Sequence, residues 1–409
     1  MAFLKMRETR VMPSLKIKPF PRRSGVQKGT GSPPPHLHGA GMAIAGGGTG
    51  GHLFPGIAIA EEFLRRDPAH RVLFIGTERG LEKRVLCELG YPLRTLNVEG
   101  LQGRGPGRIL AALLKIPGGL LASLRILRSF RPAVVIGVGG YASGPAVLAA
   151  RLMGLKTAIA EQNAFPGLTN RILGRFVHRI FVTFPASLSW FPEGRTRVTG
   201  NPIRTAFLSN QTEVARRDPR FTLLIFGGSQ GAHAINRIVV DALNSLESLK
   251  DRVRFIHQTG EMDHEMVAAA YREKGFAAEV SPFISDMAAA YRQADLLLCR
   301  AGATSIAEIT AGGKAAVLIP FPFAVKDHQM QNAEVLVRAG AAEMIPEKEL
   351  DGRKLAAVIE RLLLHPERIK QMEAASAALG KIHAAADIVD GCLELVINRR
   401  PTACRGGER

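Results

Sequence analysis

The sequence predicts an α/β protein made of two doubly wound, Rossmann-like domains that face each other across a cleft. Short apolar strands alternate with helices along most of the chain, a pattern typical of parallel sheets covered by helices on both faces. A strand, a glycine turn and a helix occur together at 42–64, and the same unit starts again at 221–246. The length of 409 residues suits two domains better than a single core.

The composition describes a soluble globular protein with a large positive charge. Apolar residues make up 46% of the chain and charged residues 22%, and the formal net charge is +18. The segment 1–40 holds eight Lys or Arg against one Glu and is rich in Pro, Gly and Ser. We therefore expect 1–40 to be a disordered basic extension and 398–409 to be a flexible tail. A basic protein can bind nucleic acid, membrane phosphates or acidic ligands.

The sequence lacks the patterns of several other protein classes. Its four cysteines are scattered without a Cys-x-x-Cys pair, which argues against a zinc site or a disulfide framework and fits a reducing cytoplasm. The N-terminal segment has no apolar h-region, so it is not a secretory signal. No Asp-x-Asp, zinc-protease, hydrolase-elbow or Walker P-loop motif is present, and a site without metal or cofactor is predicted. Few aromatic residues and no recognition motif argue against nucleic acid as a partner.

The first half of the chain alternates six expected strands with helices and is predicted to form a domain over 41–200. The first helix is expected to begin near Pro55, because the first turn of a helix tolerates the missing N–H of proline. A long basic and apolar stretch at 101–131 precedes the fourth strand. The expected strands are 42–45, 71–76, 93–98, 133–139, 156–160 and 179–183, and the expected helices lie near 55–64, 79–89, 143–153 and 168–176.

The pattern restarts in the second half, which is predicted to form a domain over 201–382. The boundary is expected near Gly200-Asn201-Pro202. An apolar strand leads into a second glycine turn, Gly227–Gly231, and a helix follows. The expected strands are 221–226, 253–257, 278–282, 295–299, 315–319 and 341–345, with helices between them. Helices at 352–364 and 367–379 and the apolar segment 383–397 close the chain.

The first glycine turn, Gly46-Gly47-Gly48-Thr49-Gly50-Gly51-His52, is a candidate anion site. Glycines let the main chain approach a ligand closely, and the unpaired N–H groups at a helix start favour negative charge. A turn that only joins a strand to a helix is the alternative. The turn also fits G-x-G-x-x-G, which would suit a nicotinamide dinucleotide. That interpretation expects an acidic residue at the end of the second strand, where Gly76-Thr77 stands instead.

Two further polar segments follow strands of the second half. Residues 299–308 combine small side chains with a helix start that suits a diphosphate, and Glu308 could accept hydrogen bonds from two ribose hydroxyls. Ser305-x-x-Glu308 also fits a helix capping box. The cluster 326–332 offers Gln329 as a partner for sugar hydroxyls, or it is an ordinary helix amino terminus.

The stretch 100–132 contains six Lys or Arg residues and no Asp or Glu. Aliphatic residues are interleaved with the basic ones, which include Arg104, Arg108 and Lys115. A basic amphipathic segment of this kind can lie on an anionic membrane, where each basic residue contributes roughly 1 kcal/mol. The alternative is a crossover helix with a buried apolar face and a solvated basic face.

Seven motifs occur in one order along nearly the whole chain, from 42 to 397. They are Gly46–His52 with Phe54-Pro55-Gly56, Gly139-Gly140-Tyr141 with Ser143-Gly144-Pro145, Glu161-Gln162-Asn163, Gly167–Asn170, Gly200–Arg204, Gly227–Gly231 and Asp327-His328-Gln329. This series resembles the MurG family, the bacterial undecaprenyldiphospho-muramoylpentapeptide β-N-acetylglucosaminyltransferases. Seven motifs in order are far more specific than any one of them.

The resemblance implies a GT-B fold with UDP-GlcNAc bound between the domains and no metal. It implies an inverting hexosyltransferase that moves GlcNAc onto undecaprenyl-diphospho-MurNAc-pentapeptide (lipid I), giving lipid II for peptidoglycan synthesis. The enzyme would be peripheral on the cytoplasmic face of the cell membrane, with UDP-GlcNAc, lipid I and the anionic membrane surface as partners. Arg104, Arg108 and Lys115 would contact that surface. The family's last helix returns to the N-terminal domain, so 383–397 is expected to do the same.

The resemblance also implies roles for individual residues. Ile284 would contact uracil, Glu308 would bind the ribose, and Gln329 and Asn163 would hold the GlcNAc. The diphosphate would meet Ser229, Arg204 and the helix start Ala303, Thr304, Ser305, Ile306 and Ala307. Thr49, Gly50 and Gly51 would shape the catalytic side and receive the acceptor's pyrophosphate, with Tyr141 and Asn170 also on the acceptor side. The family commonly has histidine before Glu-Gln-Asn, but Ala160 stands there, so His52 becomes the candidate general base.

Overall fold

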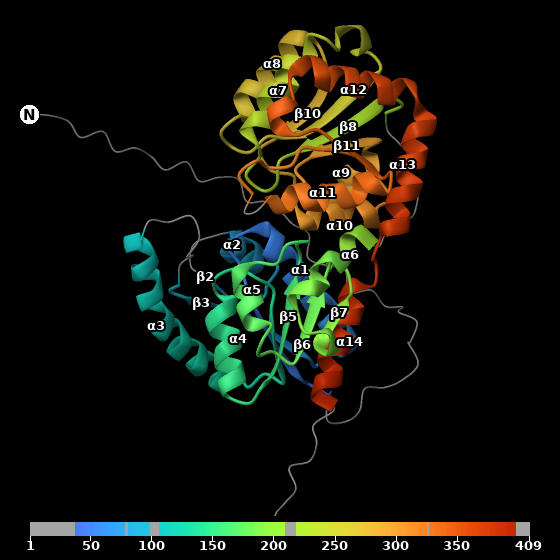
Figure 1. Ribbon diagram of the computed structural model, residues 1–409. Helices are drawn as coiled ribbons and strands as arrows, with labels where there is room; N and C mark the ends of the chain where they lie inside the picture. The colour runs from blue at the N-terminus through green and yellow to red at the C-terminus, as the bar shows by residue number, and fades with distance from the viewer. Residues whose placement is uncertain (1–36, 78–80, 99–105, 209–217, 325–326, 398–409) are drawn as a thin grey trace, which may run out of the picture.

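A computed structural model describes residues 37–77, 81–98, 106–208, 218–324 and 327–397. The chain forms two parallel sheets with helices on both faces, one above the other in Figure 1. The strand order is β3-β2-β1-β4-β5-β6-β7 in one sheet and β10-β9-β8-β11-β12-β13 in the other. These are the two doubly wound domains that the sequence predicts.

The N-terminal sheet is sandwiched because its strands are apolar on both faces. In β1, Met42 and Ile44 pack with α1, α2 and α14, whereas Ala43 and Ala45 pack with α3 and α4. The strands are β1 (Gly41–Ala45), β2 (Arg71–Thr77), β3 (Leu93–Leu96), β4 (Val134–Gly137), β5 (Lys156–Glu161), β6 (Arg179–Val182) and β7 (Thr196–Val198). The helices are α1 (Gly50–Arg66), α2 (Leu81–Glu88), α3 (Pro106–Phe130), α4 (Ser143–Leu152) and α5 (Leu168–Leu173).

The C-terminal sheet follows the same plan. Leu223 and Ile225 of β8 pack with α7, α8 and α12, and Leu224 and Phe226 pack with α9, α10 and α11. The strands are β8 (Phe221–Phe226), β9 (Val253–Gln258), β10 (Ala277–Ser281), β11 (Leu296–Cys299), β12 (Ala315–Leu318) and β13 (Ala342–Met344). The helices are α6 (Thr205–Leu208), α7 (His233–Leu243), α8 (His264–Lys274), α9 (Met287–Gln293), α10 (Ala303–Ala311), α11 (His328–Arg338), α12 (Gly352–Leu364) and α13 (Pro366–Leu379).

The last helix, α14 (Ala384–Ile397), lies beside the N-terminal sheet and not beside the sheet that precedes it in the sequence (Figure 1). Its buried residues Ile388, Val389 and Cys392 belong to the core formed by β1 and α1. Ion pairs fix its outer side, from Arg66 to Asp390 at 2.9 Å and from Arg197 to Glu394 at 2.9 Å. The apolar face of α14 therefore completes the N-terminal domain.

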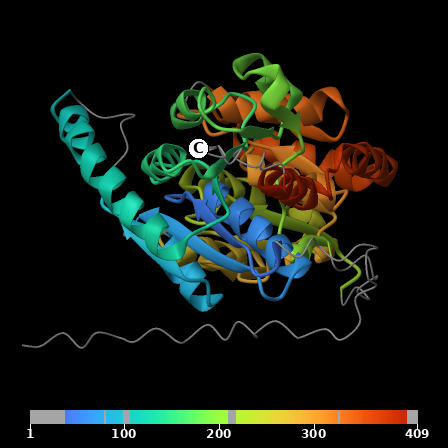
Figure 2. The same cartoon turned by 90° about the horizontal axis from the view of Figure 1, so that it is seen from below.

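The stretch that was expected at 101–131 contains the crossover helix α3, which connects β3 to β4. Figures 1 and 2 place α3 at the margin of the N-terminal domain, on the opposite side from α14. Its buried face includes Leu127 and Ser123. Among the described residues, no helix is long and apolar enough to cross a membrane.

Residues just before the predicted start of the N-terminal domain at residue 41 already pack against that domain. The expected extension ended at residue 40, but Leu37 is buried and its carbonyl lies 3.1 Å from Nε2 of His70. Asp67 contacts Nδ1 of His38 at 2.8 Å and accepts a hydrogen bond from the backbone of Gly39. Residues 37–39 therefore contact the N-terminal domain although they precede its predicted start, and the extent of the basic extension stays a prediction. Residues 1–36 and 398–409 lie outside the described residues.

Candidate functional site

The carboxyl ends of the strands in both sheets point to the boundary between the domains, where ligands bind in doubly wound proteins. Helix α1 follows the first glycine turn and α10 follows β11, and the two helix starts meet there. The hydroxyl of Thr304 donates to the carbonyl of Gly51 at 3.3 Å. On another side of the boundary, the guanidinium of Arg84 lies 5.4 Å from the ring centre of Phe283. The predicted acceptor and donor loops are thus neighbours.

The first glycine turn presents a helix amino terminus without a side-chain cap. Helix α1 begins at Gly50, and the N-cap residue Thr49 makes no capping hydrogen bond and the first turn holds no acidic residue. Its backbone N–H groups and the positive end of the helix dipole are therefore free to meet an anion. Gly51 lies at the domain boundary, where its carbonyl accepts from Thr304, and Thr49 and Gly50 precede it directly in the chain.

His52 is the third residue of α1, in its first turn, and packs against the loop after β4. Its Nδ1 lies 3.3 Å from the hydroxyl of Thr49, and its ring lies so close to Gly139 that a Cβ there would come within 2.5 Å. Burial lowers the pKa of His52, and His328 lowers it further. A hydrogen bond with the Gly47 backbone and the charge of Glu82 act in the opposite direction. The imidazole is therefore mainly neutral near neutral pH and can accept a proton.

The buried Glu308 and the partly buried Arg204 form an ion pair at the boundary. A guanidinium nitrogen of Arg204 donates to the Glu308 carboxylate at 3.0 Å, and the guanidinium also lies over the rings of Phe54 and Phe207. Burial raises the pKa of the Glu308 carboxyl, and Arg204 opposes that shift. The capping-box interpretation is wrong, because α10 begins at Ala303 with Gly302 as its N-cap. Ser305 is therefore the third helical residue and Glu308 the sixth.

The start of α10 is a second free helix amino terminus. Its N-cap Gly302 makes no side-chain capping bond, and the first turn contains no acidic residue. Ala303 and Ile306 are buried, whereas Thr304, Ser305 and Ala307 are partly exposed. Small side chains at an uncapped helix start leave backbone N–H groups accessible to an anion.

The second glycine turn is tied to the loop that contains Ile284. Ser229 is exposed in the turn. The buried side chain of Gln258 donates to the carbonyl of Gly228 at 2.6 Å and accepts from the backbone N–H of Ile284 at 3.3 Å. One amide at the end of β9 therefore fixes the spacing of two loops. The Ile284 side chain is partly buried against the core of the domain.

A buried polar network supports the second glycine turn from behind. His257 Nε2 donates to the Asn236 amide oxygen at 3.0 Å, and the hydroxyl of Tyr271 donates to His257 Nδ1 at 3.1 Å. The Asn236 amide also donates to the carbonyl of Thr259 and to Asp263. Burial lowers the pKa of His257 to about 3, so the ring is neutral and has a defined tautomer.

Asn163 contacts polar residues of both domains. Its backbone N–H and side-chain amide donate to Glu161, and its amide oxygen lies 3.5 Å from Nδ2 of Asn332 on α11. The buried Asn332 also accepts from the backbone N–H of Ala164 at 3.1 Å. Glu161 is buried, which raises its pKa, and accepts further hydrogen bonds from Gly167 and Asn170.

The other predicted residues lie around this centre. Gln329 in the first turn of α11 accepts a hydrogen bond from the backbone of Phe321 at 2.9 Å. Tyr141 is 48% exposed in the turn after β4. Asn170 is buried, and its amide donates to Ala160 and Glu161, so the structure shows it holding the Glu161 loop.

The basic residues predicted to meet the membrane are only partly described. Arg104 lies outside the described residues, and for Arg108 only its position in α3 is described. Lys115 is partly buried on α3. The exposed apolar residues of this helix include Ile116 and Leu121.

The sequence analysis predicts no role for three polar residues that hold the loops of the site together: Glu82, Gln258 and Asn332. Each is buried and bonds mainly to backbone atoms of a neighbouring loop. The sequence does show that Gln258 is a polar residue at the end of a strand. It does not show which backbone groups such a residue binds, because those groups are distant in the sequence. The separation is 34 residues for Glu82 and 168 for Asn332.

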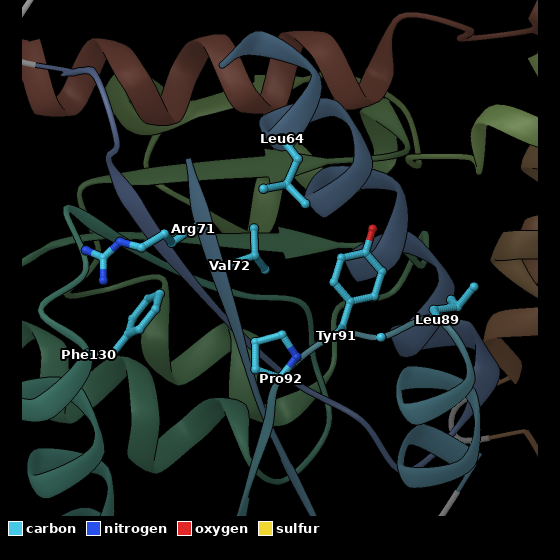
Figure 3. A pocket seen from close by; sticks show the side chains of 8 residues that line it. Leu64, Arg71, Val72, Leu89, Tyr91, Pro92 and Phe130 are labelled. Carbon is cyan, nitrogen blue, oxygen red and sulfur yellow. The ribbon is translucent and has the colours of Figure 1, made fainter. Parts of the chain in front are cut away.

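A separate hollow of about 580 Å³ lies at the opposite edge of the N-terminal sheet (Figure 3). Arg71 of β2 and Phe130 of α3 line one end, and Tyr91 and Leu89 line the other. Because ligands of doubly wound sheets bind at the carboxyl ends of the strands, this hollow is not the candidate active site.

Two doubly wound domains that meet at one boundary, where the starts of α1 and α10 are in contact, define the GT-B fold. Comparison with models of known protein families identifies the family within this fold. The model for the glycosyltransferase family 28 N-terminal domain matches residues 42–182, and the model for the C-terminal domain of that family matches 222–390. The chain belongs to glycosyltransferase family 28 and, within it, to the MurG family.

The sequences of individual relatives support this family assignment. A UDP-N-acetylglucosamine--N-acetylmuramyl-(pentapeptide) pyrophosphoryl-undecaprenol N-acetylglucosamine transferase from Syntrophus aciditrophicus is 63% identical over 355 residues, covering 87% of this chain and 98% of that protein. The protein of the same name from Myxococcus xanthus is 52% identical over 356 residues, covering 87% and 93%.

Solved structures show the same relationship. The crystal structure of Acinetobacter baumannii MurG has a TM-score of 0.68 at 32% identity and covers 87% of this chain and 99% of that one. UDP-GlcNAc 2-epimerase from Neisseria meningitidis has a TM-score of 0.62 at 14% identity over 87% of this chain and 100% of that one, and shares the fold alone.

Proposed function

We propose that this protein transfers GlcNAc from UDP-GlcNAc to the sugar of undecaprenyl-diphospho-MurNAc-pentapeptide, giving lipid II with inversion at the anomeric carbon. The main support for this function is the 63% identity to the N-acetylglucosamine transferase of Syntrophus aciditrophicus, over 98% of the length of that protein. The site geometry supports it, since two uncapped helix starts meet at the domain boundary, as a diphosphate donor and acceptor require.

The C-terminal domain would bind the donor. Uracil would lie against the backbone of Ile284, and the ribose would bind to Glu308. The diphosphate would meet Ser229, the start of α10 from Ala303 to Ala307, and Arg204. The GlcNAc would be held by Gln329 and Asn163. The buried amide of Gln258 supports this arrangement, because it fixes the distance between the Ser229 turn and the Ile284 loop.

The reaction is a single displacement. The acceptor hydroxyl attacks the anomeric carbon of the α-linked GlcNAc, His52 removes the hydroxyl proton, and the bond to the UDP oxygen breaks. Helix N–H groups and Arg204 stabilise the charge that grows on the leaving diphosphate. The lowered pKa of His52 supports its role, because only the neutral imidazole can take the proton.

The N-terminal domain, 41–200 with the returning helix at 383–397, would face the acceptor and the membrane. Its glycine turn with Thr49, Gly50 and Gly51 would receive the acceptor's pyrophosphate, and Tyr141 and Asn170 would lie on that side. The protein would be peripheral on the cytoplasmic face, and Arg104, Arg108 and Lys115 would meet anionic lipid. The exposed Ile116 and Leu121 on α3 support this orientation.

Calorimetry of the full chain with UDP-GlcNAc, UDP-GalNAc and NADH tests the donor assignment. We expect UDP-GlcNAc to bind at least about tenfold more tightly than UDP-GalNAc, a difference of about 1.4 kcal/mol, and NADH not to bind. Binding of NADH without binding of UDP-GlcNAc would overturn the proposal.

A further inference from the structure

A buried carboxylate that the transfer mechanism does not use lies beneath the first glycine turn. Glu82 is 1% exposed, in the first turn of α2. Its Oε1 accepts hydrogen bonds from the backbone N–H of Gly48 at 2.9 Å and from the hydroxyl of Thr77 at 2.8 Å. The carboxylate therefore links the end of β2 to the turn that precedes α1.

The contact between Glu82 and the turn leaves no free space. A Cβ added at Gly47 would come within 2.5 Å of Oε1 of Glu82. Gly47 also has a φ of +145°, a backbone conformation that side chains other than glycine rarely adopt. The path of the turn is therefore matched to the carboxylate.

The hydrogen bonds alone do not require a charge at this position. The hydrogen bonds from Gly48 and Thr77 both go to Oε1 of Glu82. Its Oε2 has no hydrogen-bond partner among the residues that the structure describes. Glutamine could accept the same bonds through its single oxygen. Exchange of Glu82 for glutamine would therefore keep these bonds and remove only the carboxylate.

We propose that Glu82 is a positioning residue for the transfer reaction, which holds the first glycine turn in place and keeps a negative charge beside His52. This inference rests on the proposed role of His52 as the base. Glu82 lies within electrostatic reach of the imidazole, as does His328 on α11. The other polar groups at the ring are the Gly47 backbone and the Thr49 hydroxyl.

The charge of Glu82 opposes the two influences that weaken the base. Burial and His328 lower the pKa of His52, whereas Glu82 raises it. Without the carboxylate, the ring would be a weaker base and would lose its proton at a lower pH. The transition state, in which His52 gains a proton, would also lose a stabilising charge.

The variant that separates charge from shape is Glu82→Gln, and Glu62→Gln is its matched control. Glu62 belongs to the same domain, and its exchange removes the same charge from an ion pair with Arg65 and Arg66. The full chain is assayed with UDP-GlcNAc and a short-chain lipid I analogue, and kcat/KM is measured against pH. The His52 ring is titrated by NMR in the same proteins, with His52→Gln used to assign its signal.

We expect Glu82→Gln to melt within a few degrees of the wild type and to bind UDP unchanged. The His52 titration and the acidic limb of kcat/KM should both move to lower pH by about half a unit or more, with a lower plateau. Glu62→Gln should match the wild type. A His52 titration that Glu82→Gln leaves unchanged would overturn the proposal, and so would an acidic limb that persists in His52→Gln. Because NMR needs no turnover, an inactive wild type would contradict the proposed function and leave this test intact.

Discussion

At the scale of single residues, the proposed donor site depends most on the pairing of Arg204 with Glu308. The carboxylate is buried and accepts from a guanidinium that is itself held over two aromatic rings. A carboxylate fixed in this way keeps its second oxygen in a defined direction, which suits the recognition of adjacent ribose hydroxyls. The sequence located Glu308 at this helix but left open whether it capped the helix, and the observed N-cap at Gly302 removes that alternative.

We predict that Glu308→Ala weakens UDP-GlcNAc binding by about 1.5–3 kcal/mol, the range for charge-assisted hydrogen bonds. Calorimetry with UDP-GlcNAc measures the loss, and binding of UMP should fall by a similar factor because the ribose is common to both. Glu308→Gln, which can still accept a hydrogen bond, should lose less. Equal affinity in Glu308→Ala and the wild type would rule out the ribose assignment.

The residues that the sequence could not reveal share one physical property. Glu82, Gln258 and Asn332 act through hydrogen bonds to backbone atoms that only the folded chain brings near them. No spacing along the chain encodes such a contact. By contrast, glycine turns and helix starts are local features, so the two glycine turns and the helix start near 303 could be predicted from sequence.

At the scale of elements, the second glycine turn interlocks with the end of β9. Gly231 has a φ of +76°, and a Cβ there would lie 1.9 Å from the carbonyl oxygen of Thr259. Gly228 has a φ of +103°, and no atom lies within 4 Å of its added Cβ. The two glycines therefore serve different purposes, close packing in one case and backbone conformation in the other.

We predict that Gly231→Ala abolishes UDP binding and lowers stability by more than about 2 kcal/mol, because the turn must separate from Thr259. Gly228→Ala should cost about 1 kcal/mol for its backbone conformation alone. Urea unfolding and UDP titration of both variants provide the comparison. A larger loss of stability and UDP binding in Gly228→Ala than in Gly231→Ala would contradict the claim that close packing against Thr259 holds the turn.

The network behind the turn predicts a dependence of stability on pH. His257 has a pKa of about 3 in the folded chain and about 6.5 when unfolded, so the unfolded chain binds more protons between these values. The free energy of unfolding should therefore fall as the pH drops from about 7 to 5, by up to about 1.4 kcal/mol per pH unit from this residue below its unfolded pKa. His257→Gln should flatten that slope, as measured by urea unfolding at several pH values. A slope as steep in the variant as in the wild type would show that other groups cause it.

At the scale of the whole molecule, the sequence predicted the architecture because buried parallel strands and glycine turns are strong local patterns. It missed β7, a three-residue strand at the sheet edge whose residues are partly exposed and so show no apolar run. It also missed Leu37, one buried residue after a long polar segment. The return of α14 came from family resemblance, since an apolar face alone does not specify which sheet it covers.

The placement of α3 at the margin of the N-terminal domain leads to a prediction about membranes (Figure 2). Replacing Arg104, Arg108 and Lys115 with Glu should release the protein from anionic vesicles, because these cations would lose their lipid phosphates. Binding of the wild type should also weaken as salt rises. Transfer to a short-chain, water-soluble acceptor should be largely preserved.

Vesicle co-sedimentation and the soluble-acceptor assay on the same variant decide this prediction. Replacing Arg237, Arg272 and Lys274 with Glu makes the same change in charge on exposed positions of the C-terminal domain and serves as the control. Undiminished sedimentation of the α3 variant would mean that another surface meets the bilayer.

The central claim is that the two domains form one inverting transferase site for GlcNAc. The most direct test incubates the full chain with UDP-GlcNAc and a short-chain lipid I analogue and follows the anomeric proton by NMR. We expect one GlcNAc joined to the acceptor through a β linkage, release of one UDP, and no change in UDP-GlcNAc when the acceptor is omitted. An α-linked product, or conversion of UDP-GlcNAc to an epimer without acceptor, would contradict it.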